Sequence, residues 1–273
     1  MKNLNMFCLT LEPSHYNFIK ELGYTPVGLG EKLFNNDWLT DKSGKNISKK
    51  NKNYGEYTYH YWLWKNYLDK INEEWIGFCQ YRKFWSLNKH KEKNINFNNL
   101  NSQVLKSIPK NFEKYESILG EPMFINQFKL MKFVKKGFKI IVKKPSFLLS
   151  ENNRNINFHF DLMHGENNLS KAIDLLDDKN RNDFKKFVNS NTSFNPHNMF
   201  ICKSKKKLND YYEDLFPWLE RCEDLFGFDN LKGFDMTRIY GFLAERFMSY
   251  WFQKNTKFIT MPIIFYDIRK DIN

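Results

Sequence analysis

One short segment constrains the fold of this chain more than any other. Residues 75–79, Trp-Ile-Gly-Phe-Cys, form an apolar run typical of a buried strand, and Gln80, Arg82 and Lys83 follow directly. Ligands of open α/β sheets bind at the carboxyl ends of strands, so a cationic cluster there predicts a site for an anion such as a phosphate. The alternative is a strand that leaves the core and meets solvent. The segment taken alone favours this alternative.

Residues 56–68, upstream of that strand, predict a helix. Its expected buried stripe has helical spacing and consists of Tyr57, Tyr61, Trp64 and Leu68. A strand is expected over 6–10, and loops over 24–30 and 41–54, which are rich in Gly, Pro, Asn, Ser and Lys.

The rest of the chain continues this alternation, and its last third is mostly helical. Strands are expected over residues 115–124, 199–202 and 259–265. Helices are expected over 169–177, 182–189, 208–226 (broken or bent near Pro217) and 236–252. No repeat or linker is visible. We therefore expect one α/β domain over residues 1–273, a sheet flanked by helices with a helix-rich C-terminal half.

Composition and charge narrow the class of protein. The 273 residues are 41% hydrophobic and 18% aromatic, which indicates a globular chain and not a disordered one. The formal charge of +12 predicts an anionic partner: a nucleotide, a membrane surface or a nucleic acid. The four cysteines are far apart and form no Cys-x-x-Cys pair, so neither a zinc site nor a disulfide framework is indicated.

Reduced cysteines favour a cytoplasmic protein. Residues 1–10 do not resemble a signal peptide, and no run of about 18 apolar residues predicts a membrane span. Peripheral membrane contact stays open. The basic, amphipathic residues 131–145 either face a membrane or acceptor, or form a solvated helix or hairpin, and the solvated element is favoured.

Five motifs then line up in one order. They are Asp-Lys-Ser-Gly-Lys-Asn-Ile-Ser at 41–48 followed by Asn51 and Tyr-Gly-Glu at 54–56, Trp-Leu-Trp-Lys-Asn at 62–66, Ile-Gly-Phe-Cys-Gln-Tyr-Arg-Lys-Phe at 76–84, Pro-His-Asn-Met-Phe-Ile at 196–201 and Gly-Phe-Leu-Ala-Glu-Arg-Phe at 241–247. This order, over about residues 24–265, resembles a bacterial family labelled as a domain of unknown function. Its members occur among capsular polysaccharide, exopolysaccharide and O-antigen biosynthesis proteins and are treated as glycosyltransferases.

The resemblance implies a GT-A-like, Rossmann-like mixed sheet. By analogy, the strand over 75–82 corresponds to the one that ends in a metal-binding Asp-x-Asp in many GT-A enzymes. This chain contains no Asp-x-Asp, and it has Gln80 where the family tends to have His and Lys83 where it tends to have Arg. Arg82 and Lys83 can neutralise a departing diphosphate as fixed cations. We assign no metal ligands, and dependence on Mn²⁺ or Mg²⁺ stays open.

The resemblance also suggests catalytic residues. Arg82 would neutralise the leaving group, Glu245 would act as general base or orient the sugar, and His164 would hydrogen-bond the diphosphate or the acceptor. The structural alternatives are an ion pair for Arg82, a buried salt bridge for Glu245 and a satisfied core position for His164. A metal pair of His164 with Asp161 would lack a third ligand.

Further residues are expected to bind the two substrates. On the donor side these are Asp41, Asn46, Ser48, Asn51, Glu56, Lys65, Gln80, Arg82 and Lys83. On the acceptor side they are Asn198 and Arg246. The alternatives are that Ser48 caps a turn or helix and that Asn198 is a turn residue beside Pro196.

The expected function is therefore glycosyl transfer. A hexose, galactose in pyranose or furanose form, would move from a nucleotide-sugar, UDP-linked, to a lipid-linked surface glycan at the anionic inner face of the membrane. One alternative is a basic nucleic-acid-binding protein, although no such motif is present and no nucleic acid is expected as a partner. Another is a non-catalytic sugar-nucleotide-binding relative, which Gln80 makes conceivable.

Overall fold

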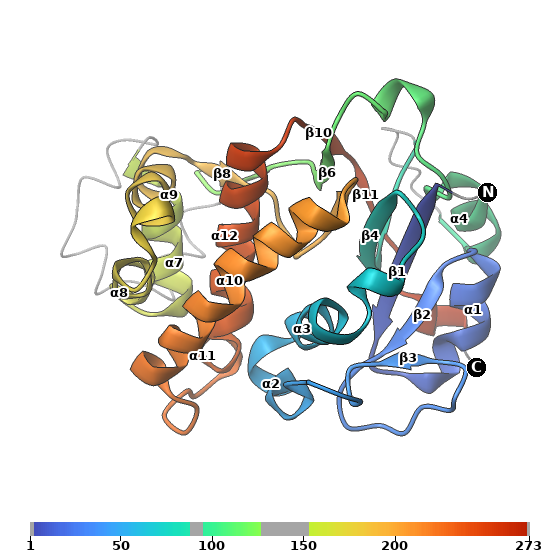
Figure 1. Cartoon of the computed structure of the whole chain (residues 1–273), viewed down its shortest axis with the longest axis horizontal. Helices are drawn as coiled ribbons and strands as arrows, with labels where there is room; N and C mark the ends of the chain where they lie inside the picture. The colour runs from blue at the N-terminus through green and yellow to red at the C-terminus, as the bar shows by residue number, and fades with distance from the viewer. Residues whose placement is uncertain (1–2, 88–94, 127–152, 272–273) are drawn as a thin grey trace. The chain divides into compact units, whose positions relative to one another are not determined.

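The computed structural model describes residues 3–87, 95–126 and 153–271 (Figure 1). The chain divides into two compact units. Unit 1 comprises Met1–Glu121, His197–Glu213 and Phe252–Asn273, and unit 2 comprises Pro122–Pro196 and Asp214–Trp251. The prediction of a single domain over residues 1–273 depends on how the two units are arranged, so it stays an expectation. The basic segment 131–145 lies outside the described residues.

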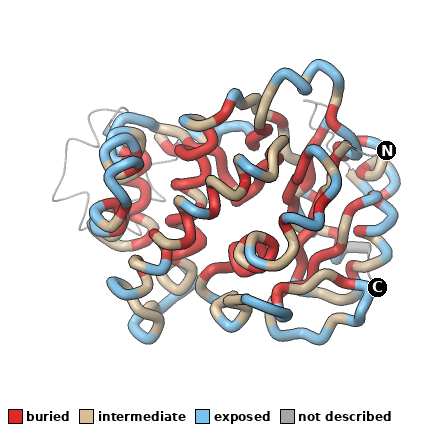
Figure 2. The backbone as a smooth tube through the Cα atoms, in the orientation of Figure 1, coloured by how far each residue is buried: buried red, intermediate tan, exposed pale blue. Residues whose placement is uncertain are grey.

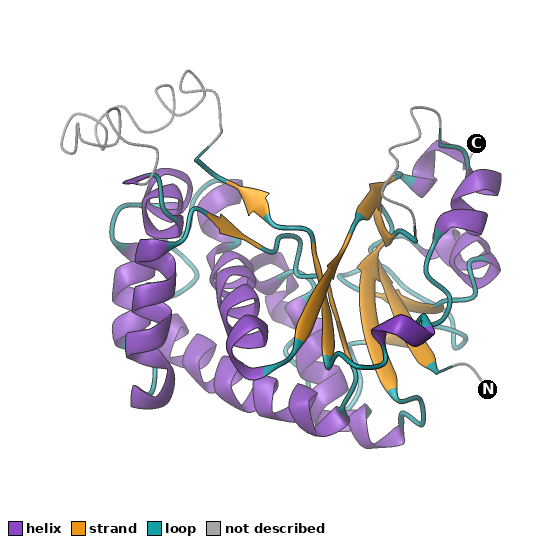
Figure 3. Cartoon of the chain, turned by 90° about the horizontal axis from the view of Figure 1, so that it is seen from above, coloured by secondary structure: helices purple, strands orange, loops and turns teal. Residues whose placement is uncertain are grey.

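Unit 1 is built on a mixed β-sheet (Figures 1 and 3). Its strands are β1 (Leu4–Thr10), β2 (Thr25–Gly28), β3 (Leu39–Thr40), β4 (Trp75–Gln80), β5 (Lys83–Trp85), β6 (Ser117–Gly120), β9 (Phe200–Cys202), β10 (Phe258–Met261) and β11 (Ile263–Phe265). The order is β10-β6-β9-β4-β1-β2-β3, and β5 joins β4 to β11. β1 runs parallel to β2 and β4, whereas β9 runs antiparallel to β4 and β6.

The central pair β1–β4 explains why the sequence signal was strongest there. Both strands are apolar and buried along nearly their whole length (Figure 2), as is typical of parallel strands whose two faces are both covered. Their register places Phe7 opposite Phe78 and Leu9 opposite Gln80. Gln80 therefore ends β4 at the edge of the sheet where β1 also ends.

The helices that belong wholly to unit 1 are α1 (Tyr16–Glu21), α2 (Asn51–Tyr54), α3 (Tyr57–Asn66) and α4 (Phe97–Gln103). The long helices α10 (Lys205–Phe226) and α12 (Ile239–Asn255) contribute residues to both units. Helix α3 confirms the expected helix over 56–68, with shorter ends.

The buried face of α3 is wider than the sequence predicted. Tyr57 is buried as expected, but Tyr61 and Trp64 are only half-buried. His60 is buried instead: its ring lies 4.3 Å from that of Phe78, and its Nδ1 lies 2.8 Å from the Tyr212 hydroxyl. Because α3 is covered by the sheet on one side and by the first turns of α10 on another, a single apolar stripe underestimates its core.

Two expected loops contain regular structure. Residues 24–30 include β2, which pairs with both β1 and β3. Residues 41–54 include a 3₁₀ turn, η2 (Ser48–Lys50), and α2, and Tyr54 is buried. These expectations were wrong because tertiary neighbours override the local turn signals of Gly, Pro and Asn.

Helix α10 was expected to break or bend near Pro217. The break is wrong, because the helix continues without interruption through that residue, and the bend stays a prediction. Proline removes one backbone hydrogen bond from a helix interior. The flanking Phe216, Trp218 and Leu219 are all buried, and this packing offsets the loss.

Unit 2 is mainly helical. Besides its parts of α10 and α12 it contains α7 (Ile156–His164), α8 (Asn168–Asp174), α9 (Asp178–Ser190), α11 (Phe234–Thr237) and the hairpin of β7 (Met123–Phe124) with β8 (Ser193–Phe194). Phe184 of α9 lies at its core, with ring centroids 5.9 Å from Trp218 and 5.5 Å from Phe247. The helices expected over 169–177 and 182–189 are present with shifted ends, and the one expected over 236–252 is divided into α11 and α12.

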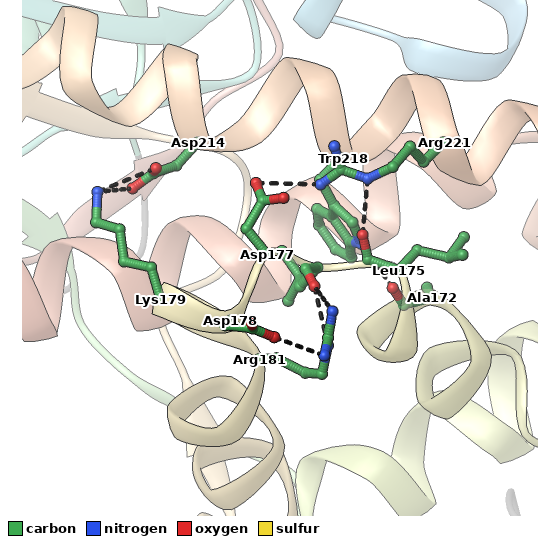
Figure 4. A network of polar contacts seen from close by, with 10 residues as sticks. Ala172, Leu175, Asp177, Asp178, Lys179, Arg181, Asp214, Trp218 and Arg221 are labelled. Carbon is green, nitrogen blue, oxygen red and sulfur yellow. Dashed lines mark hydrogen bonds and ion pairs between the residues drawn. The ribbon is translucent and has the colours of Figure 1, made fainter.

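Polar contacts tie α8, α9 and α10 together in unit 2 (Figure 4). The Trp218 indole nitrogen donates to the Ala172 carbonyl at 2.6 Å, and Arg221 Nε donates to the Leu175 carbonyl at 2.7 Å. Lys179 of α9 forms an ion pair with Asp214 of α10 at 3.0 Å. Since the bonds of Trp218 and Arg221 use carbonyls at the end of α8, they also satisfy groups that this helix leaves unpaired.

The observed architecture confirms the mixed α/β fold with a helix-rich C-terminal half. Within the described ranges, no helix is both long enough and apolar enough to cross a bilayer.

Candidate functional site

A carboxylate held by two amides lies at the carboxyl end of β4. The Gln80 side-chain nitrogen donates to Glu56 Oε1 at 2.8 Å, and the Asn198 side-chain nitrogen donates to the same oxygen at 3.0 Å. Gln80 also donates to the His197 carbonyl at 3.0 Å. Three segments that are far apart in sequence therefore meet at one oxygen: the residue before α3, the end of β4 and the turn before β9. We call Glu56, Gln80 and Asn198 the carboxylate clamp.

The turn before β9 has an unusual backbone. His197 and Asn198 are consecutive non-glycine residues with positive φ angles of 80° and 53°. Such residues cost about 1–3 kcal/mol each and occur mostly at functional sites, where surrounding contacts hold them. The carboxylate clamp supplies two of these contacts.

The His197 imidazole is half-buried at this turn. Burial, helped by the charge of Lys83, lowers its pKa to about 3, so the ring is neutral at physiological pH. Its centroid lies 5.2 Å from that of Phe265, at an angle of 83° between the rings.

The cationic residues after β4 lie in the turn between β4 and β5. Lys83 pairs with Gln80 across this turn. Arg82 is exposed, and its guanidinium lies 4.9 Å from the centroid of the Tyr81 ring. Both cations therefore belong to the turn that follows the clamp residue Gln80.

A cavity of about 590 Å³ lies beside the carboxyl ends of β1 and β2. It is lined by Leu11, Glu12, Leu29, Gly30, Glu31, Lys32, Lys42, Ser48, Lys49, Asn51 and Lys52, and we call it the lysine cavity. Four lysines face two glutamates there, so its charge favours anions. Its volume suits a nucleotide-sized ligand. Ser48 and Asn51, expected on the donor side, are among its walls.

The cavity is not lined by Asp41, Asn46 or Lys65, which were also expected on the donor side. Asp41 is completely buried, and burial raises the pKa of its carboxyl, which the Thr58 hydroxyl and Lys42 oppose. The expectation that Asp41 contacts the donor from a surface loop is thereby corrected. Asn46 holds its own loop, because its Oδ1 accepts a hydrogen bond from the Ser48 hydroxyl at 2.8 Å. A short polar residue can serve the backbone as readily as a ligand.

Lys65 also lies apart from the clamp. It belongs to the last turn of α3, whereas Glu56 precedes the first turn. At 1.5 Å of rise per residue, the two backbones are about 13 Å apart along the helix. The Lys65 ammonium lies 3.0 Å from the centroid of the Trp64 ring, a cation–π contact.

Glu245, Arg246 and His164 belong to unit 2. Arg246 is buried, forms an ion pair with Glu245, and lies 4.3 Å from the centroid of the Phe194 ring. The His164 ring stacks on Phe242 at 4.0 Å, and its Nδ1 lies 3.1 Å from the Asp235 carbonyl. This geometry matches the structural alternatives for these residues: a buried salt bridge and a packed core histidine.

A GT-A-like fold implies Mn²⁺ or Mg²⁺ on the donor diphosphate. These cations prefer several carboxylate oxygens, whereas the carboxylate clamp contains one carboxylate, Glu56, whose Oε1 already accepts two amide N–H groups. No group of three or more His, Cys, Asp or Glu side chains suited to a metal ion occurs in the part of the chain that the structure describes. The donor set at the β4 end does not fit such an ion, and no step below passes through one.

Sequence reasoning missed several residues of the lysine cavity and of the surroundings of the clamp. Lys49 and Lys52 stand in a lysine-rich stretch that could have indicated an anion site. His197 precedes the predicted Asn198, but its backbone conformation has no clear sequence signal. Phe265 was expected in a strand but not as a site residue, since only strand pairing brings it to this edge.

Comparison with known families and structures gives a consistent result. The model of a family described as a domain of unknown function, DUF4422, matches residues 9–256. The apo structure of the bifunctional glycosyltransferase WbbM is 18% identical to the chain with a TM-score of 0.60, and the match covers 96% of this chain and 45% of that one. The chain thus spans less than half of that WbbM structure. The similarity shows that the chain has the fold of a GT-A-type glycosyltransferase.

Two fungal structures resemble the chain more weakly. Core-mannan synthase A from Aspergillus fumigatus, in its Mn/GDP form, is 11% identical with a TM-score of 0.37, over 96% of this chain and 74% of that one. The mannosyltransferase Ktr4p from S. cerevisiae is 10% identical with a TM-score of 0.33, over 96% and 70%. No curated protein matches the chain.

Proposed function

The chain belongs to the DUF4422 family, and from this premise we propose that it is a glycosyltransferase that moves a hexose from a nucleotide-sugar donor to a glycan acceptor. The observation that carries the proposal is the carboxylate clamp at the carboxyl end of β4, with the lysine cavity at the ends of the neighbouring strands. Ligands of open α/β sheets bind at this edge.

The donor nucleotide would occupy the lysine cavity. Its diphosphate would meet ammonium groups there, and Arg82 and Lys83 would extend this positive surface past the end of β4. Glycosyl transfer breaks the bond between the anomeric carbon and a diphosphate oxygen and forms a bond from that carbon to an acceptor hydroxyl oxygen, whose proton passes to water. Negative charge therefore grows on the leaving diphosphate. Fixed cations stabilise that charge through charge-assisted hydrogen bonds, and more strongly in the transition state than before it.

The carboxylate clamp would position the reacting groups. Glu56 is held by two N–H donors, so its orientation is set before any ligand binds. A preorganised carboxylate can orient sugar hydroxyls without first giving up mobility. We assign Glu56 and Asn198 to the sugars rather than to the nucleotide, because both residues lie at the β4–β9 side of the edge.

The finer parts of the proposal rest on the family resemblance and on charge. They are a UDP-linked donor, galactose as the sugar, a lipid-linked acceptor, and a role in capsule, O-antigen or exopolysaccharide synthesis. The net charge of +12 would favour contact with the anionic cytoplasmic face of a membrane, which adds about 1 kcal/mol for each basic residue close to the surface.

The proposal is tested by titrating the protein with UDP-galactose, UDP-glucose and GDP-mannose, following its melting temperature and the release of nucleoside diphosphate. A bound donor stabilises the folded protein by mass action. The double substitution Lys49→Gln with Lys52→Gln should weaken donor binding, whereas Lys106→Gln, an exposed lysine elsewhere in unit 1, should not. Binding without turnover in the presence of acceptor would indicate a non-catalytic relative. Absence of binding to all three nucleotides would contradict the proposal.

A further inference from the structure

An exposed aromatic ring lies beside the carboxylate clamp. Phe265 is 63% exposed although it belongs to a strand, β11. It pairs directly with Lys83 of β5, and Lys83 in turn pairs with Gln80 of the clamp. The pairing of β11 with β5 and of β5 with β4 therefore places the Phe265 ring near the end of β4.

The His197 ring packs against Phe265 edge to face. The backbones of His197 and Asn198 are both in the left-handed region. The strain at these two adjacent positions fixes the direction of the His197 ring. The strain is held by the bonds of Gln80 to the His197 carbonyl and of Asn198 to Glu56. A strained turn held by a dedicated polar network, next to an exposed aromatic ring, is expected of a binding site more than of a plain surface turn.

This position lies on the opposite side of β4 from the lysine cavity. The sheet order is β9-β4-β1-β2, the lysine cavity adjoins the ends of β1 and β2, and His197 leads toward β9. A donor whose nucleotide fills the lysine cavity would place its sugar near the end of β4. Phe265 and His197 would then lie beyond that sugar, on the side from which an acceptor approaches.

We propose that Phe265, His197 and Lys83 form a subsite for one sugar ring of the acceptor glycan. The proposal rests on the proposed transferase function and adds the place where the acceptor is recognised. One face of a pyranose carries axial C–H groups, which pack on the electron-rich face of an aromatic ring. The ring hydroxyls at its rim can bond to an imidazole, which both donates and accepts, and to an ammonium, which donates. Phe265, His197 and Lys83 supply these three kinds of contact.

Saturation-transfer NMR on the full chain tests the subsite, with UDP present and methyl β-D-galactopyranoside, methyl β-D-galactofuranoside and methyl α-D-mannopyranoside as probes. At least one probe should receive saturation on the C–H groups of a single face. Phe265→Ala should weaken its binding about three- to tenfold, the range expected for a lost aromatic contact. Phe265→Trp should restore it. Leu33→Ala is the matched control, because Leu33 is a 91% exposed apolar residue of the same unit.

Three results would overturn the subsite. They are no saturation of any probe by the wild type, equal saturation by Phe265→Ala, and a loss in Phe265→Ala of nucleotide-sugar affinity instead of saccharide affinity. Calorimetric titration with UDP-galactose distinguishes the two proposals. If it fails with the wild type while the saccharide signal at Phe265 is present, the proposed donor is wrong and the sugar subsite stands. Melting temperatures close to wild type verify that each variant is folded.

Discussion

Gln80 and Glu56 are joined by a hydrogen bond of 2.8 Å between the side-chain nitrogen of the first and Oε1 of the second, although one ends a strand and the other precedes a helix. Asn198 bonds to the same oxygen. An amide that donates two N–H groups, to Glu56 and to the His197 carbonyl, fixes both a carboxylate and a strained turn. Gln80 is therefore a structural part of the site.

Removing the clamp carboxylate should lower both stability and activity. Glu56→Ala leaves the amide donors of Gln80 and Asn198 without their shared acceptor, which costs about 1–3 kcal/mol for such half-buried groups. Urea unfolding measures the change. Glu21→Ala, an exposed glutamate at the end of α1, is the control and should stay within about 0.5 kcal/mol of wild type. Equal free energies of unfolding of the two variants would mean that the clamp does not stabilise the fold.

The strain at His197 is measurable with two substitutions at this one position. His197→Ala and His197→Gly both remove the ring, but only glycine adopts a φ of 80° without penalty. The glycine variant should therefore be more stable than the alanine variant by about 1 kcal/mol. Both should lose acceptor affinity to the same extent. An alanine variant as stable as the glycine variant would contradict a strained turn.

The end of β2 should not accept a larger residue. A Cβ at Gly28 would lie 2.5 Å from the Phe34 ring, a distance that forces one of them to move. Gly28→Ala should destabilise by about 1–3 kcal/mol through overpacking. Phe34→Leu should recover part of this loss in the double variant, since it shortens the side chain that clashes. Chemical denaturation of the four proteins completes the cycle, and strict additivity would count against a direct clash.

Stability should fall in mild acid. Burial lowers the pKa values of His60, His159 and His197 to about 3, below the value of about 6.5 expected in the unfolded chain. The unfolded state therefore binds more protons than the folded state between these values. Each neutral buried histidine contributes stability above pH 6.5, which is lost toward pH 3 with a slope of up to about 1.4 kcal/mol per pH unit.

Replacing one of these histidines should flatten that slope. His60→Gln keeps a polar side chain near the Tyr212 hydroxyl but removes the titrating ring. Unfolding free energies measured from pH 7 to pH 4 should then decline less steeply than in wild type, even if the variant is less stable at pH 7. An unchanged slope would show that His60 does not govern the acid response.

The buried pair in unit 2 separates a structural role from a catalytic one. Glu245→Leu leaves the Arg246 charge buried with its main counter-charge gone, which should cost about 3–5 kcal/mol. Adding Arg246→Met should restore much of the loss, because two apolar residues can replace a buried pair. Both the free energy of unfolding and the transferase activity should be measured for the single and the double variant. If the double variant is stable but inactive, the Glu245–Arg246 pair takes part in activity, as the family resemblance suggested for both residues.

Local patterns predicted much of the framework. The strand that ends at Gln80 and the helix that follows Glu56 are both present, because apolar runs and helical spacing record which residues must leave water. The same reasoning failed for β2, whose Thr-Pro-Val-Gly sequence has the features of a turn. Its strand state depends on β1 and β3, which a local window does not contain.

The candidate site divides in the same way. Glu56, Gln80 and Asn198 were each selected from motifs, yet nothing in their spacing required one shared oxygen. Lys65 was selected by the same reasoning and lies at the far end of α3. Motif membership says that a residue matters to the family, and it does not say which residues share a site.

By itself, the sequence determined the fold class, the positive charge and the polar end of the central strand, since these follow from composition and short-range periodicity. Only the tertiary structure decided that Glu56 is held by two amides, that Asp41 is buried, and that Phe265 is exposed beside His197. The physical reason is the separation along the sequence of the residues that interact. Burial of an apolar run is encoded within a few residues, whereas a hydrogen bond between Glu56 and Asn198 depends on the pairing of strands from distant parts of the chain.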